Sequence, residues 1–228
     1  MSIPSLEELR RKADILIFDL DGTLIDSMGV WNQVDIEFLG KRGLEVTPEY
    51  LDAVKKNSSR DAAVITRRLF DLEDTPEQIM KEWDDMVSEH YRGSIPLKEG
   101  VFEYLTRAKE LGFSLMAATA LSIDHAGPCL RRCNIYGLFN SVITLDDMGN
   151  KINKSDPAIY IRAMENAGGS DPSRVVVFED VPACIEGAKS GGFITCAVHD
   201  PVGLGMLSWD NMASAADYSI MSFAEALG

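Results

Sequence analysis

The chain has 228 residues, which is enough for one large domain or for a core domain with a smaller insertion, and enough to bury a substantial hydrophobic core. Hydrophobic residues make up 46% and charged residues 25%, the balance of an ordinary globular protein. The formal net charge of −14 produces a long-range field that repels nucleic-acid backbones and anionic membranes, so we expect neither as a partner. An anionic substrate would have to be drawn in by a local cation, which points towards a metal ion.

Neither a membrane segment nor a secretion signal is evident in the sequence. No hydrophobic run approaches the ~20 residues of a membrane span, and the charged N-terminus lacks the hydrophobic centre of a signal peptide. The four cysteines show no Cys-x-x-Cys spacing and fall in hydrophobic segments: Cys129, Cys133, Cys184 and Cys196. We expect reduced, buried thiols in a cytoplasmic protein that is a monomer or a weak dimer.

The first predicted element is a strand over residues 15–18, where four consecutive hydrophobic residues indicate a parallel sheet covered on both faces. Asp19 and Asp21 follow two positions apart, so in extended chain both side chains can face one spot beyond the strand. Gly22 then permits a sharp turn. Two carboxylates this close repel each other and usually need a cation, a shared proton or donor groups nearby. An isolated Asp-x-Asp-Gly would more often be a solvated turn.

The stretch over residues 28–92 predicts an all-helical insertion. A hydrophobic stripe indicates the first helix, and its residues are Trp31, Val34, Ile36, Phe38 and Leu39. Thr-Pro-Glu at 47–49 and again at 75–77 has the N-cap threonine and first-turn proline of a helix start. A polar break at 56–60 precedes a further helix between them. A crossover between parallel strands needs only about a dozen residues or somewhat more, so we expect a separate domain here, which we call the cap.

From residue 93 onwards, short hydrophobic strands alternate with helices. The expected strands cover residues 113–118, 141–145, 175–178 and 193–198. The expected helices cover residues 101–111, 124–134, 157–167 and 183–189, with a short one at 222–227. The alternation predicts βαβ units and therefore an α/β fold, a doubly wound, Rossmann-like parallel sheet with helices on both faces. We expect residues 1–27 and 93–228 to form the catalytic core and residues 28–92 the cap.

Ligands of a doubly wound sheet bind at the carboxyl ends of its strands, and polar residues stand there. Thr119 follows one predicted strand and could donate to an anion, although a threonine there is more often a turn or N-cap residue. Glu179 and Asp180 follow another strand. The helix dipole could explain one such acid, but a pair that matches the first pair favours oxygen ligands for a hard divalent cation such as Mg²⁺. Lys154 lies between these groups in the sequence, where a solvated surface lysine is the alternative.

The stretch Asp-Leu-Asp-Gly-Thr-Leu-Ile-Asp-Ser at 19–27, followed in order by Thr119, Lys154 and the acid pair, resembles the motif series of the haloacid dehalogenase-like hydrolases. The resemblance covers essentially the whole chain. It implies that Asp19 is a phosphate-accepting nucleophile and Asp21 a general acid/base. It also implies a phosphate-binding hydroxyl at Thr119 and a lysine at position 154 that steadies the phosphate.

The same resemblance implies a bound Mg²⁺ ion. Its ligands would be Asp19, the backbone carbonyl of Asp21, and the acidic pair Glu179 and Asp180, of which Asp180 would be the direct ligand. The helical insertion after the first motif resembles the small cap of the branch that contains phosphoglycolate phosphatases and β-phosphoglucomutases.

Two residues depart from the pattern of that branch. Ser155 stands where proline often follows the lysine, and Ala120 stands in the phosphate pocket where asparagine or serine commonly follows the hydroxyl residue. Neither departure removes a charge that the chemistry needs.

We therefore predict an Mg²⁺-dependent phosphatase that hydrolyses a small phosphorylated metabolite, such as a sugar phosphate, through an aspartyl-phosphate on Asp19. We expect the polar break at 56–60, and Arg60 in particular, to contact the substrate and select it. A solvated turn capped by Ser59 is the alternative. A sugar-phosphate mutase is the nearest rival function. Trp31 stands where the mutases have a histidine, yet the segment around Arg60 resembles their cap loop.

Two further hypotheses of function fit the sequence less well. A phospho-accepting receiver module also uses an aspartate, a threonine and a lysine on a doubly wound sheet, but this chain is too long and its motif order differs. In dehalogenases and phosphonatases the second aspartate of the first motif is replaced, whereas Asp21 is present here.

Overall fold

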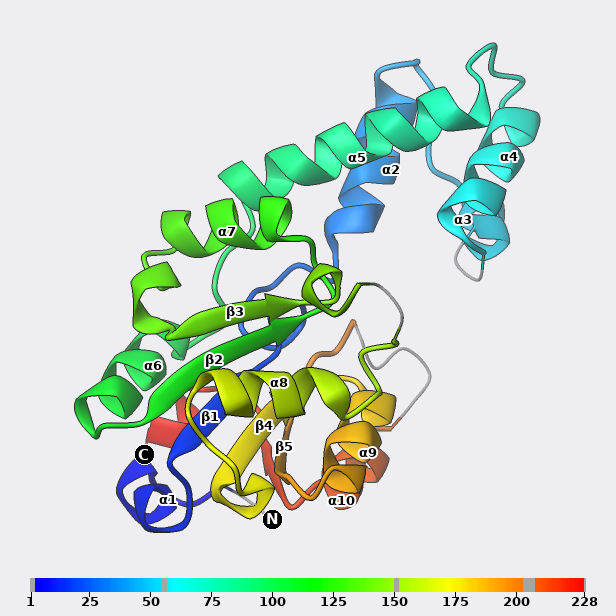
Figure 1. The fold of residues 1–228 in the computed structure, drawn as a ribbon. Helices are drawn as coiled ribbons and strands as arrows, with labels where there is room; N and C mark the ends of the chain where they lie inside the picture. Colours follow the sequence, from blue (N-terminus) through cyan, green and yellow to red (C-terminus); the bar gives the residue numbers. More distant parts are fainter. Residues whose placement is uncertain (1–2, 55–56, 150–151, 203–207, 228) are drawn as a thin grey trace. The chain divides into compact units, whose positions relative to one another are not determined.

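The computed structural model describes residues 3–54, 57–149, 152–202 and 208–227. The chain forms two compact units, which we describe separately (Figure 1). The core unit consists of residues 1–28 and 95–228, and the cap unit of residues 29–94, which are inserted between its two parts.

A six-stranded sheet with the order β3-β2-β1-β4-β5-β6 forms the centre of the core unit (Figure 1). Its strands are β1 (Ile15–Phe18), β2 (Ser114–Thr119), β3 (Ser141–Thr144), β4 (Val175–Glu179), β5 (Ile194–Val198) and β6 (Tyr218–Ile220). Every strand pairing is parallel, so the predicted doubly wound α/β fold is confirmed. The strand β1 is central and all four of its residues are buried, as its hydrophobic run indicates.

Helices pack against both faces of this sheet. The α-helices of the core unit are α1 (Leu6–Lys12), α6 (Val101–Glu110), α7 (Ile123–Arg132), α8 (Ala158–Asn166), α9 (Pro182–Ser190) and α10 (Trp209–Ala215). Short 3-10 helices complete it at η1 (Tyr136–Leu138), η2 (Asp146–Met148), η3 (Pro172–Arg174) and η4 (Glu225–Leu227). Because side chains alternate along a strand, β1 contributes to two cores. Ile15 and Ile17 pack in the cluster that contains α8, while Phe18 stacks on Phe178 with ring centres 4.5 Å apart.

The boundaries differ from the predictions at a few places. The strands β2 and β4 include Thr119 and Glu179, because the sheet pairing continues to Thr144 and Ala197 beside them. The helices α1 and α10 and the strand β6 were not predicted. Each is short, and β6 depends on its pairing with β5 rather than on a strand pattern of its own.

The described residues of the cap unit form four helices: α2 (Val30–Gly40), α3 (Pro48–Val54), α4 (Ser59–Leu69) and α5 (Pro76–Gly93). The buried side of α2 carries Val34, Phe38 and Leu39, whereas Trp31, which belongs to the same predicted hydrophobic stripe, is 51% exposed. The N-cap of α4 is Ser58, not the Ser59 that the alternative of a solvated turn would use, since the Ser58 hydroxyl accepts from the Asp61 amide (3.2 Å).

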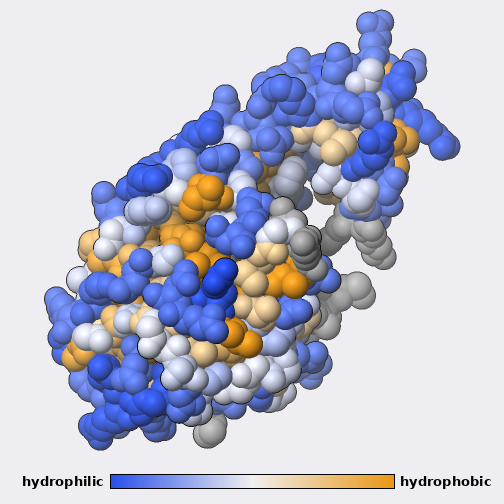
Figure 2. Space-filling view, viewed as in Figure 1, coloured by the Kyte–Doolittle hydropathy of each residue, from blue (hydrophilic) through white to orange (hydrophobic). Residues whose placement is uncertain are grey.

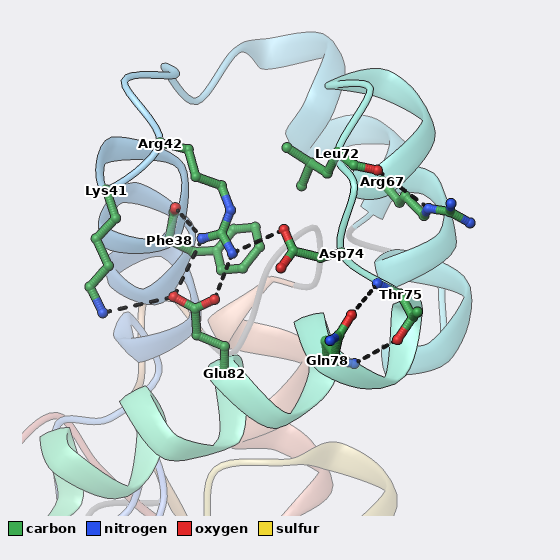
Figure 3. Close-up of polar contacts among 9 residues, drawn as sticks. All are labelled: Phe38, Lys41, Arg42, Arg67, Leu72, Asp74, Thr75, Gln78 and Glu82. Carbon is green, nitrogen blue, oxygen red and sulfur yellow. Dashed lines mark hydrogen bonds and ion pairs between the residues drawn. The ribbon is translucent and has the colours of Figure 1, made fainter.

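Arg42, just after the end of α2, links that helix to the start of α5 (Figure 3). Its guanidinium lies over the Phe38 ring, 3.8 Å from the ring centre, and donates to Glu82 (2.7 Å) and to Asp74 (3.3 Å). The start of α5 has a full capping box, in which Thr75 and Gln78 each accept from the other's backbone amide. Arg42 is therefore paired with two acids of its own unit.

The surface is mostly hydrophilic on the face that Figure 2 shows, with hydrophobic residues in small patches over the core unit. All four cysteines are free thiols; Cys129, Cys184 and Cys196 are buried, as predicted, whereas Cys133 is only half-buried. Within the described ranges, no helix combines the length and the hydrophobicity that crossing a bilayer requires.

Candidate active site

Three acidic side chains gather at the carboxyl ends of the two central strands. The parallel register places Phe18 beside Phe178, and the Asp19 amide donates to the Phe178 carbonyl (3.0 Å), so the acids that follow both strands become neighbours. One carboxylate oxygen from each of Asp19, Glu179 and Asp180 lies within 4.8 Å of the others, and all three residues are buried. The sequence expectation that the two acid pairs share one edge of the sheet thus holds for these three side chains.

Lys154 reaches into this cluster from the loop before α8. Its ammonium forms an ion pair with Asp19 and a second one with Glu179 (2.7 Å), and the lysine side chain is only 11% exposed. Burial alone would lower the pKa of Lys154, but the charges of Asp19 and Glu179 outweigh it, so the pKa is raised and the lysine stays charged.

The loop that carries Lys154 packs tightly on α9. A Cβ atom placed on Gly187 would lie 1.9 Å from the backbone oxygen of Ser155, so the two segments touch only because position 187 has no side chain. Gly187 therefore helps to fix where Lys154 enters the site.

The acid pair on β4 is desolvated and incompletely paired. Burial raises the pKa of Glu179 to about 7, and burial together with the charges of Asp19 and Glu179 raises the pKa of Asp180 to about 8. Tyr160 donates its hydroxyl hydrogen to one Glu179 oxygen (2.8 Å). Among the described residues, Glu179 Oε2 and Asp180 Oδ2 are buried and have no hydrogen-bond partner.

These features fit a divalent cation. Buried polar atoms in native proteins are almost always paired, so two unpaired carboxylate oxygens in one cluster call for a cation or a proton. Carboxylate oxygens are the ligands that hard cations prefer. The buried triad of Asp19, Glu179 and Asp180 could therefore hold a metal ion.

Asp21 is placed on the turn after β1 and is partly exposed. Its carboxylate accepts a hydrogen bond from the Ser27 hydroxyl (2.5 Å), and it is not one of the three acids whose oxygens cluster. Gly22 has a φ of +73°, and a Cβ there would lie 2.1 Å from Asp180 Oδ2. The turn therefore places the Asp21 carboxylate outside the cluster of three acids, and Gly22 packs against Asp180.

The remaining predicted site residues lie on two different units. Thr119 is buried at the end of β2, where its hydroxyl oxygen accepts from the Leu121 amide (3.1 Å), and exposed Ala120 follows it. Arg60 lies on α4 of the cap unit, is 69% exposed and pairs with Glu77 (2.9 Å). Of the polar break at 56–60, Lys56 falls outside the described residues.

Comparison with known proteins identifies the family to which the chain belongs. The family model described as "Haloacid dehalogenase-like hydrolase" matches residues 16–198, most of the chain. The chain is a haloacid dehalogenase-like hydrolase. This assignment confirms the resemblance of the motif series and removes the receiver-module alternative.

Several relatives of this hydrolase are named as phosphatases. A phosphorylated carbohydrates phosphatase of Thermotoga maritima is 26% identical over 78% of this chain and 82% of its own length. A phosphoglycolate phosphatase of Pseudomonas putida is 27% identical over 78% of this chain and 66% of its own. A crystal structure of a Thermotoga maritima protein, assigned provisionally as a β-phosphoglucomutase, covers 94% of this chain and 96% of that one with a TM-score of 0.82 and 23% identity, which shows a shared fold.

Three residues of the hydrolase at this site were not found by sequence reasoning. Tyr160, a hydrophobic position of α8 in the sequence, turns its hydroxyl to Glu179. The Thr23 hydroxyl donates to Asp180 (3.4 Å), and its only signal was its place in the first motif. Cys184 is buried near Glu179 and Lys154; burial, with the Glu179 charge, raises its thiol pKa to about 12, so this cysteine is unreactive as a thiolate.

Proposed function

We propose that the hydrolase is an Mg²⁺-dependent phosphatase of small phosphorylated metabolites. One observation carries the proposal: a buried lysine contacts Asp19 at the centre of a carboxylate cluster that still has unpaired oxygens. A carboxylate can attack a phosphoryl group only where its own charge and the phosphate's charge are offset. Lys154 supplies one positive charge, and the cluster provides the ligands for more.

The residues divide the chemistry between them. An Asp19 oxygen attacks phosphorus in line, which forms an aspartyl-phosphate as the bond to the ester oxygen breaks. Asp21 gives its proton to the departing alkoxide, then takes a proton from the water that attacks phosphorus and releases inorganic phosphate from Asp19. Lys154 neutralises the phosphoryl oxygens throughout. Thr119 and the backbone at Ala120 bind the phosphate.

Asp19, Asp180, the backbone carbonyl of Asp21 and, beside them, Glu179 would hold Mg²⁺. When bound, the ion supplies charge compensation for the phosphoryl oxygens. This set contains both acids whose oxygens are left unpaired and whose pKa values are raised.

The names of the relatives support a phosphorylated sugar or a similar small metabolite as the substrate. The cap unit, residues 29–94, would read the leaving group, with Arg60 as a contact for it. A closing lid commonly completes such a site.

A screen of phosphorylated sugars, nucleotides and short organic acids tests the proposal. Release of inorganic phosphate with Mg²⁺, and its loss with EDTA, is the expected result. Equal activity with EDTA and with Mg²⁺ would exclude the metal, and inactivity on every phosphate ester would exclude the phosphatase.

The mutase alternative rests on the shared fold with the Thermotoga maritima protein and on the segment around Arg60. A mutase must pass the phosphoryl group to a sugar hydroxyl instead of water. Trp31 has only an indole N–H donor and cannot relay that proton. We expect glucose 1-phosphate, if it is accepted, to give free phosphate. Phosphorus NMR decides: faster accumulation of the 6-phosphate isomer would establish the mutase.

A further inference from the structure

Lys98 joins three segments of the core unit through a single ammonium group. Its Nζ donates to the backbone carbonyls of Gly22 (2.7 Å) and His199 (2.7 Å) and forms an ion pair with Asp200 (3.0 Å). The lysine side chain is 15% exposed and the Asp200 side chain 2% exposed. An ammonium has three hydrogens, so these three acceptors use its whole donor capacity.

Of these three contacts, the one between Lys98 and the Gly22 carbonyl bears on the geometry of the candidate active site. Gly22 follows Asp21 directly, and on its other side it packs so closely against Asp180 that a Cβ would lie 2.1 Å from the carboxylate oxygen. A shift of this glycine therefore moves both the acid/base residue and a face of the carboxylate cluster.

The backbone around Lys98 holds the same turn along its length. The Lys98 amide donates to the Leu24 carbonyl (2.9 Å), the Asp26 amide donates to the Pro96 carbonyl (3.0 Å), and Ile25 forms an antiparallel bridge with Leu97. At the other end, His199 directly follows β5, and its amide donates to Ile220 of β6 (3.0 Å). Lys98 thus connects a tight turn to the end of the sheet.

A need for stability does not account for this arrangement. A buried lysine–aspartate pair costs desolvation and is often no more stabilising than hydrophobic residues of the same volume. Balancing the charge of Asp200 would also not require a contact with Gly22. We infer that Lys98 is a positioning residue for Asp21: together with Asp200 it fixes the turn so that the Asp21 carboxyl meets the leaving oxygen. This inference rests on the proposed function.

The inference predicts an effect that depends on the leaving group. An alkyl phosphate releases an alkoxide that needs a proton, whereas p-nitrophenyl phosphate releases a stable phenolate that does not. The ratio of kcat/KM for glycerol phosphate to that for p-nitrophenyl phosphate therefore reports on Asp21. Because it is a ratio, it does not depend on the fraction of enzyme that is folded.

The variants are Lys98→Met, the double variant Lys98→Met/Asp200→Asn, and Lys189→Met as the matched control. Lys189 also donates to a backbone carbonyl (Ala215, 2.7 Å) and faces an aspartate (Asp217, 3.6 Å), but it lies on α9 and has no place in the mechanism. The ratio should fall by about tenfold to a hundredfold in Lys98→Met, through kcat rather than KM, since general acid catalysis contributes at least that much. It should stay low in the double variant and be unchanged in Lys189→Met.

Two results would overturn the inference. One is a wild-type ratio in Lys98→Met. The other is a ratio that recovers in the double variant, because it would trace the effect to the unbalanced charge of Asp200 rather than to the lost Gly22 contact. If the unmutated enzyme hydrolyses neither substrate nor any other phosphate ester, the proposed function fails, and this inference falls with it.

Discussion

The core unit and the cap unit both contain acidic side chains that are shielded from water, but the hydrogen-bond partners of these side chains differ. In the cap unit, Asp35 accepts from the Tyr50 hydroxyl (2.6 Å), which in turn accepts from Thr66 (3.3 Å). Burial raises the pKa of Asp35, and its partner Tyr50 is a neutral hydroxyl. In the core unit, by contrast, Glu179 and Asp180 crowd against Asp19, and each keeps a buried oxygen without a partner among the described residues.

The difference separates a structural acid from the acids of the candidate site. A desolvated carboxylate whose oxygens are paired can persist as part of the packing, whereas like charges with unpaired oxygens require a ligand or a proton. Burial and a raised pKa occur in both units and therefore do not by themselves identify a site. Unpaired carboxylate oxygens beside a buried lysine are what distinguish the candidate site in the core unit.

The largest expected effect tests this distinction directly. Asp19→Asn should lower kcat by on the order of 10⁴-fold or more, because it removes a nucleophile, while the fold persists. Asp35→Asn is the matched control, since an amide oxygen can still accept from Tyr50; it should keep p-nitrophenyl phosphate hydrolysis close to the wild-type rate. Substantial turnover by an Asp19→Asn sample that mass spectrometry shows free of deamidation would contradict the nucleophile assignment.

Gly187→Ala should have the next largest effect on the site. The added Cβ meets the Ser155 backbone at 1.9 Å, so the loop must move and carry Lys154 away from Asp19. We expect a loss of about tenfold to a hundredfold in kcat, since a misplacement of roughly 1 Å can cost that much. Gly137→Ala, where a Cβ would meet nothing within 4 Å, is the control. Equal activity of the two variants, measured at matched folded fraction, would show that the Lys154 loop tolerates the shift.

The sequence predicted the parts of this site that depend on strand ends. The hydrophobic run 15–18 and the run before Glu179 mark two strands, and parallel pairing then brings their terminal acids together. Residues that reach the site from helices and loops have no comparable pattern in the sequence. Tyr160 reads as one more hydrophobic residue on its helix, and Lys98 reads as a surface lysine until the structure brings the turn at Gly22 beside it. The structure gives the positions of the predicted site residues, and the chemical roles assigned to all of them stay predictions.

Mg²⁺ should stabilise the unmutated protein, and Asp180→Asn should weaken that effect. Binding to the folded state alone stabilises by about 2.7 kcal/mol when the ion is at a hundred times its Kd. The amide removes a ligand charge and also relieves the crowding at the cluster, so metal-free Asp180→Asn should melt no lower than the metal-free wild type. Thermal melting with EDTA and with increasing Mg²⁺ measures both without any turnover. An equal Mg²⁺ response in wild type and variant would remove Asp180 from the ligand set.

Arg60→Ala should have the smallest effect, and it brings the comparison back to the cap unit. The ion pair of Arg60 with Glu77 is exposed on both sides, and such pairs contribute about 0–1 kcal/mol, so the melting temperature should hardly change. If Arg60 reads the leaving group, its loss should change the ranking among sugar phosphates by about tenfold at most, the lower end for one specificity contact. Hydrolysis of p-nitrophenyl phosphate should be unaffected. Glu77→Gln is the control, because it removes the same ion pair but keeps the guanidinium, and it should preserve the ranking. A uniform loss on every substrate would mean that Arg60 supports the cap's structure, and an equal change in both variants would mean that the ion pair, not the arginine, matters.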